Sequence, residues 1–213
     1  IMVNRASSSL GVVESSVATK GDDMVVVELP GYKNPEEARK TMSTTASIEL
    51  YHAKSVATEK STFRTYKIDE RGTEGSGSPK VTFEVAATGK KLVPGDPEYK
   101  KMIEGWELIL KGSDLKNATT EIINDTSATP RFFFQGEGAE KLDAWSRRSM
   151  NGGENLAFVL DGVVLSCNPK ADGAILKNEA VLQGTYPTTY VASLTNLLNS
   201  GALPVSLTEV SNR

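Results

Sequence analysis

Alternating apolar and polar positions predict strands in the first fifty residues. Segments 12–19 and 24–29 are rich in valine and flank a polar, glycine-containing turn, which predicts a β-hairpin. A helix is expected next, because Asn34 suits an N-cap and Pro35 suits the first helical position. Residues 46–51 then alternate cleanly, which predicts one more strand with a single buried face.

The order of these elements matches a known α+β arrangement. Residues 1–10 predict the end of a helix, with Gly11 placed as its C-terminal cap. The chain opens at Ile1 without an initiator methionine, so we expect a piece of a longer protein. One strand ahead of Ile1 would complete a β-α-β-β-α-β, ferredoxin-like unit. We call this predicted unit the base and assign it residues 1–53 plus a returning strand within 203–213.

Residues 54–111 change in composition and predict a variable connector. Segments 62–68 and 80–86 can pair as a hairpin around a linker rich in glycine, serine and charged residues. A short strand is expected over 106–110. The connector therefore separates the base from whatever follows it.

Residues 112–202 predict a second α+β unit, the head, inserted into the base. Ser113 is placed to cap a helix whose apolar face would run to Ile122. Phe132-Phe133-Phe134 predicts a short strand. Two more helices are expected, at 137–150 and from Pro187 to about Ser200.

The strongest local pattern in the chain is a hairpin. Leu156–Leu160 and Val163–Leu165 are apolar runs on either side of Asp161-Gly162. This dipeptide is typical of a type I′ turn, whose two central residues both need positive φ. Asp161 and Gly162 are therefore predicted to be structural turn residues.

Charge and reactive residues exclude several classes of function. The net charge is −3, with 24 Lys and Arg against 27 Asp and Glu, so a nucleic-acid partner is not expected. The one histidine, His52, is expected at a surface or rim, and the one cysteine, Cys167, as a small buried hydrophobe. Gly136-Glu137-Gly138 resembles a phosphate-binding turn, but the third glycine is missing and acidic residues would repel an anion. We predict no catalytic, cofactor-binding or metal-ligating residues.

Short segments in a specific order resemble the large extracytoplasmic domain of the SecD family. The resemblance covers most of the chain but not residues 54–104. The segments that carry it are Val3-Asn4-Arg5, Leu10-Gly11-Val12-Val13-Glu14, Met24 to Gly31, Pro35-Glu36-Glu37-Ala38, Thr45 to Glu49, Gly112-Ser113-Asp114-Leu115, Glu137-Gly138-Ala139, Leu156 to Ser166 and Ser200 to Pro204.

The resemblance implies a role in protein export. SecD, with SecF, assists the bacterial SecY-SecE-SecG channel, using the proton gradient to draw unfolded preproteins outward. The matching domain lies between the first two spans of an inner-membrane protein, on its extracytoplasmic side. Its head is thought to swing against its base and to contact the preprotein. The resemblance implies no enzyme activity and no cofactor, and we expect the isolated domain to be monomeric.

Two kinds of site follow from that role. A hinge is expected at the two chain crossings, at Leu110, Lys111 and Gly112 and at Gly201 and Pro204, since glycine at an element end can absorb a backbone change.

For the preprotein contact we consider Phe133, because strand alternation can leave its side chain facing away from Phe132 and Phe134. The alternative is that all three phenylalanines are core. From the residues alone, a secreted hydrolase or ligand-binding module of unrelated descent also stays open.

Overall fold

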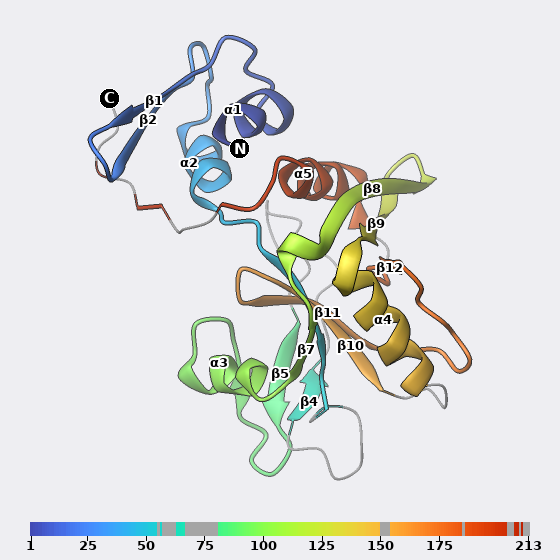
Figure 1. The fold of residues 1–213 in the computed structure, drawn as a ribbon. Coiled ribbons are helices and arrows are strands. Elements are labelled where there is room, and N and C mark those ends of the chain that lie inside the picture. Colours follow the sequence, from blue (N-terminus) through green and yellow to red (C-terminus); the bar gives the residue numbers. More distant parts are fainter. Residues whose placement is uncertain are drawn as a thin grey trace.

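Two lobes of unequal size make up the described part of the chain (Figure 1). The computed structural model describes residues 1–54, 56, 63–66, 81–149, 154–184, 186–203, 207–208 and 210. Residues 1–44 form the small lobe, drawn in blue, and residues 46–200 form the large lobe. Helices and antiparallel sheets occur in both lobes, so the predicted α+β class is confirmed.

The small lobe contains the predicted hairpin and helix. Its elements are α1 (Met2–Asn4), the π-helical turn η1 (Arg5–Ser9), β1 (Ser16–Lys20), β2 (Met24–Glu28) and α2 (Pro35–Ser43). Asn34 caps α2 by accepting a hydrogen bond from the backbone N–H of Glu37 at 3.3 Å. The strands β1 and β2 pair only with each other among the described residues. The lobe therefore depends on a small core, whose buried apolar members are Ala6, Leu10, Val12 and Met42.

A four-stranded sheet forms the centre of the large lobe. Its order is β11 (Val163–Pro169), β10 (Asn155–Leu160), β3 (Ile48–His52) and β7 (Glu107–Leu110), all antiparallel. Alternate residues enter two different cores: Leu50 and Phe158 pack on one face, Ala157 and Val159 on the other. Both faces are thus covered, which makes this sheet the middle layer of the lobe.

The second sheet covers one face of the central sheet together with two helices. Its strands are β8 (Leu115–Asn124), β9 (Ser127–Phe134), β12 (Glu179–Val181) and β13 (Tyr186–Pro187), and β9 pairs with the other three. The helices are α4 (Gly136–Arg148) and α5 (Thr188–Asn199), close to their predicted positions. Phe132 contacts Phe158 of the central sheet at a ring-centroid distance of 5.4 Å, which joins the two layers.

The third sheet covers the opposite face. It comprises β4 (Phe63–Tyr66), β5 (Thr82–Val85) and β6 (Lys91–Leu92), with α3 (Pro97–Glu104) beside it. Pairing of β4 with β5 agrees with the predicted hairpin. Residues 81–106 nevertheless do more than connect two units, because Phe83, Tyr99 and Trp106 are buried against the central sheet.

The helix predicted from Ser113 is wrong. Only one turn of 3-10 helix, η2 (Gly112–Asp114), forms there, and strand β8 follows it. Apolar residues at helical spacing suggested the helix, but Thr119 and Ile122 are β-branched and favour a strand. Cross-strand pairing decides the outcome, as where Ala118 lies opposite Phe132.

Strand β3 lies within the predicted base but joins the central sheet. Strand β3 was assigned to the base, but it pairs with β10 and β7 in the large lobe and not with β1 or β2. Its alternation predicts one buried face without specifying the sheet that buries it. The two lobes of the structure therefore meet near residue 45, and the base boundary at residue 53 stays a prediction. Of the predicted returning strand, Leu203 is outside any strand, and residues 204–206 lie outside the described residues.

Candidate functional site

Two chain crossings connect the lobes and lie next to each other. The first crossing is residues 44–47, between α2 and β3, and the second crossing is residues 200–203, after α5. The backbone N–H of Leu203 donates to the carbonyl oxygen of Thr45 at 2.8 Å, so the two crossings are directly bonded. Ala46 has φ of 56° and Gly201 has φ of 97°, so each crossing contains one left-handed residue.

Arg5 of the small lobe reaches into this junction. Its side chain has no exposed surface, and its guanidinium donates only to backbone carbonyl oxygens. Nη1 bonds the carbonyls of Thr41, at 3.0 Å, and of Thr44. Nη2 bonds Thr45 at 3.2 Å and Gly201 at 3.1 Å. One side chain thus joins the end of α2 to both crossings.

Asp161 of the large lobe reaches the first crossing from the other side. The β10–β11 turn has positive φ at Asp161 (49°) and Gly162 (78°), as a type I′ turn requires. The Asp161 carboxylate accepts from the backbone N–H of Ala46 at 3.1 Å and of Ser47 at 2.9 Å, and also from the Thr45 hydroxyl. The predicted turn residue therefore has a second contact that the turn pattern alone does not indicate.

Arg5 and Asp161 also interact electrostatically. Burial lowers the pKa of the Arg5 guanidinium, and the negative charge of Asp161 acts in the opposite direction. A buried charge needs hydrogen bonds and a nearby counter-charge to be tolerated. The backbone carbonyls provide the hydrogen bonds to Arg5, and Asp161 provides the counter-charge. Residues 44–47 are bonded by both side chains.

The predicted hinge falls partly elsewhere. Leu110 is 2% exposed and lies opposite Leu50 in the central sheet, and Gly112 approaches the backbone of Ile48. Leu110, Lys111 and Gly112 therefore join two parts of the large lobe and do not lie at the crossings between the lobes, and their role as a hinge stays a prediction. Gly201 does lie at the second crossing, while Pro204 is outside the described residues.

Phe133 differs from its two neighbours. Phe132 and Phe134 are buried in the core between the sheets, whereas Phe133 is half-buried on the other face of β9. On that face Arg131 bonds Glu121 at 2.7 Å and Glu179 at 3.2 Å. The alternative in which all three rings are core does not hold, and Phe133 has an accessible part.

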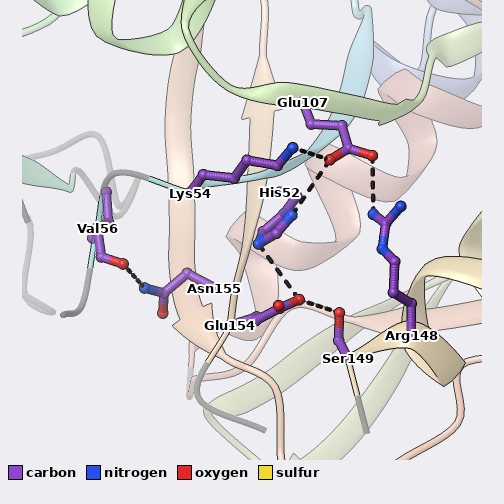
Figure 2. A network of polar contacts seen from close by, with 8 residues as sticks. All are labelled: His52, Lys54, Val56, Glu107, Arg148, Ser149, Glu154 and Asn155. Carbon is purple, nitrogen blue, oxygen red and sulfur yellow. Dashed lines mark hydrogen bonds and ion pairs between the residues drawn. The ribbon is translucent and has the colours of Figure 1, made fainter. Parts of the chain in front are cut away.

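A polar network surrounds His52, as Figure 2 shows. His52 is only 7% exposed, which corrects its expected place at a surface or rim. Its Nδ1 lies 3.6 Å from Glu107 and its Nε2 lies 3.5 Å from Glu154. The ring packs edge-on against Trp145 at a centroid distance of 5.6 Å. His52 is buried because β3 is an inner strand and α4 covers it.

Glu107 is the best-paired member of this network. It accepts from Lys54 Nζ at 2.6 Å and from Arg148 Nη2 at 2.9 Å (Figure 2). These two hydrogen bonds lower the pKa of Glu107 to about 2. Among the described residues no three His, Cys, Asp or Glu side chains converge as metal ligands would. The network therefore holds β3, β7 and the end of α4 together.

The remaining candidate residues have packing roles. Cys167 is buried, and burial raises its thiol pKa to about 12, which suits a small core residue and not a nucleophile. At the start of α4, a Cβ on Gly138 would lie 2.3 Å from Asp114, so this glycine allows close packing. The adjacent hollow of about 460 Å³ is lined by Lys111 and Lys141 but also by Asp114 and Glu137, so it has no excess positive charge for a phosphate.

Sequence reasoning gave no role to Arg5. It occurs in the motif Val3-Asn4-Arg5, but a single arginine in a short helix carries no local pattern that predicts burial. Its carbonyl partners are 36 to 196 positions away in sequence. Only the fold brings them together.

Comparisons with known proteins identify the class. A family model of the N-terminal part of the P1 domain of protein translocase subunit SecDF matches residues 1–55, and a model of the SecDF P1 head subdomain matches residues 90–205. These matches define the class of the chain as the P1 domain of a protein translocase subunit. The chain belongs to the SecDF family, as its P1 domain.

Relatives and solved structures agree with this assignment. The SecD subunit of Dictyoglomus turgidum is 28% identical over all of this chain and 40% of its own length, and that of Elusimicrobium minutum is 29% identical over 95% of this chain and 42% of its own length. A crystal structure of SecDF in a super-membrane-facing form matches with a TM-score of 0.69 and 23% identity, over 99% of this chain and 26% of that one. A structure of SecDF described as enhancing protein export matches with a TM-score of 0.64 and 22% sequence identity, over 100% of this chain and 89% of that chain. The chain thus spans about two fifths of these SecD relatives, and none of its described helices is long and apolar enough to cross a membrane.

Proposed function

We propose that the chain is the extracytoplasmic domain of a SecD subunit and assists export by moving one lobe relative to the other. The observation that carries this is the two-lobe arrangement, in a chain that matches SecDF P1 models over residues 1–55 and 90–205. Energy would come from the proton gradient through membrane helices outside this chain. SecF, the SecY-SecE-SecG channel and unfolded preproteins would be its partners.

The moving parts are the small lobe and the large lobe. The first and second crossings lie side by side, so they define a single short axis about which the lobes can turn. This axis includes Gly201 of the predicted hinge, and the predicted hinge at Leu110, Lys111 and Gly112 stays a second candidate. Pro204, which lies outside the described residues, stays a predicted hinge residue.

The preprotein contact lies on the large lobe and tolerates many sequences. An export subunit meets many unfolded chains, so apolar surface serves it better than a tight pocket. Phe133 is the candidate, since its half-buried ring lies on the outer face of β9 beside a paired arginine. The proposed role needs neither catalysis nor a cofactor from this domain.

Site-specific photo-crosslinking in the full-length protein tests this proposal. A photo-reactive residue replaces Phe133 while an exported chain is stalled in the channel, with replacements of Lys40 on the small lobe and Lys141 on α4 as controls. We expect clear crosslinks to the stalled chain from position 133 and few from position 40. Equal yields at positions 133 and 40 would place the contact elsewhere.

A further inference from the structure

Side chains from both lobes bond the backbone of the first crossing. The small lobe bonds its carbonyl oxygens, and the large lobe bonds its N–H groups. Arg5 of the small lobe donates to carbonyl oxygens of Thr44 and Thr45. Asp161 of the large lobe accepts from the N–H groups of Ala46 and Ser47. Backbone N–H and C=O groups are obligatory hydrogen-bonding groups, so every one of these bonds orients the crossing.

We infer that Arg5 and Asp161 hold the two lobes in one relative orientation by binding the backbone of the first crossing from opposite sides. We call this pair the junction clamp. Arg5 also donates to the carbonyl oxygen of Gly201 in the second crossing, so it restrains both connections between the lobes. This inference rests on the proposed function, because an orientation needs to be held only if the lobes can move.

The chemistry of the two side chains suits this positioning role. A guanidinium presents several N–H donors in a rigid fork, which lets Arg5 bond carbonyls on separate segments. An ammonium has three donors around one atom and cannot span the same set. A carboxylate accepts through two oxygens, and Asp161 uses Oδ1 toward Ser47 and Oδ2 toward Ala46. Both side chains bond the backbone of the crossing, so both are positioning residues that act through it.

Ala46 supports the same interpretation. Its φ of 56° is unfavourable for a residue with a Cβ, and such a conformation persists only when its surroundings hold it. The N–H of Ala46 is one of the two that Asp161 binds. Loss of the Asp161 contact would let this residue return to a common conformation and change the direction of the chain.

Distance measurements between the lobes test the clamp. Spin labels are placed at Lys40 and Lys141 of the full-length protein, with the buried Cys167 replaced by alanine, and the proton gradient is absent. We expect a narrow distance distribution in the parent protein. Arg5→Met, which keeps an unbranched stem but no donors, should widen it about twofold or more, and Arg5→Lys should give an intermediate width.

Asp161→Asn provides an independent variant that does not alter the small-lobe core. Asparagine also suits the first position of a type I′ turn, so the hairpin is kept while one acceptor becomes a donor. It should widen the distribution in the same direction. In the double variant the two effects should not add, because both residues act on one segment.

Matched controls separate positioning from simple destabilisation. Arg147→Met and Asp143→Asn make the same exchanges in an exposed ion pair on α4, away from the junction, and should leave the distribution unchanged. A second label pair within the large lobe, at Lys116 and Lys141, should stay narrow in every variant. If this pair widens with Arg5→Met and Asp161→Asn, the residues hold a lobe together and the inference is overturned.

The remaining outcomes distinguish the clamp from the proposed function. If the variants give distance distributions as narrow as that of the parent protein, the clamp is overturned and the proposed motion is unaffected. A parent distribution as broad as that of the variants would also overturn the clamp, while supporting mobile lobes. If Arg5→Met does not fold, Asp161→Asn decides alone, and an unchanged width in it rejects the inference.

Discussion

The small lobe and the large lobe keep their folds by different means. The large lobe has a sheet covered on both faces, with residues such as Leu50 and Val159 completely buried on opposite sides. The small lobe has a two-stranded ribbon whose Val25 and Val26 are exposed, and the charged Arg5 is among its side chains without exposed surface. The large lobe is therefore stabilised by its own interior, whereas the small lobe depends on contacts at the junction.

This difference suits a moving domain. A subunit that transmits motion needs one rigid part and one part whose position can change. The contacts at the junction are hydrogen bonds to a backbone segment, and breaking them would leave the buried Arg5 guanidinium without partners, which costs free energy. A change of orientation at the junction therefore needs these bonds to be replaced.

The largest expected effect is in the core of the large lobe. Phe132→Ala removes a fully buried ring that contacts Phe158 and should lower the free energy of unfolding by about 3–5 kcal/mol. Phe133→Ala, the matched control one residue along β9, should lower it by about 1 kcal/mol, because that ring is half-buried. Urea denaturation measures both. Equal losses of unfolding free energy in the two variants would contradict the burial of Phe132 in the core and the partial exposure of Phe133.

The next effect concerns the core of the small lobe. Met42→Ala removes one of its few buried side chains and should lower the opening free energy of amides in α2 by about 2 kcal/mol. Amides of β10 should keep their protection, because the large lobe does not need the small one. Hydrogen exchange followed by mass spectrometry gives both values. Parallel losses in α2 and β10 would show that the lobes unfold as one unit.

How far the sequence predicts this fold depends on whether a pattern is local. The β10–β11 hairpin and the start of α2 were predicted correctly, because Asp161-Gly162 and Asn34-Pro35 have strong conformational preferences of their own. Strand β8 was missed because its apolar spacing also fits a helix, and only pairing with β9 decides between them. Arg5 was missed because all its partners are distant in sequence.

A smaller effect is expected at the hairpin turn. Gly162 has φ of 78° and open space around its Cα, so a substitution there is limited by backbone strain alone. Gly162→Val should cost about 1–2 kcal/mol and lower the melting temperature by about 2–8 °C. Gly162→Asn should cost less, since asparagine tolerates this conformation. Similar melting curves for Gly162→Val and the parent protein would contradict the turn type.

The smallest effect is a dependence of stability on pH at Glu107. Its pKa falls from 4.5 to about 2 because Lys54 and Arg148 donate to it, and His52 also faces it. A lowered carboxyl pKa adds stability above about pH 4.5, and this contribution is lost as the pH falls towards 2. Glu107→Gln should reduce the slope of stability against pH in that window. An unchanged slope in urea titrations would show that Glu107 is not held by these partners.

The most direct test of the account is the distance between the lobes under working conditions. Labels at Lys40 and Lys141 of the full-length subunit, assembled with its channel partners in vesicles, report it with and without a proton gradient. We predict one population without the gradient and a second, different distance when the gradient drives export. A single distance that the gradient leaves unchanged would contradict movement of the lobes about the junction.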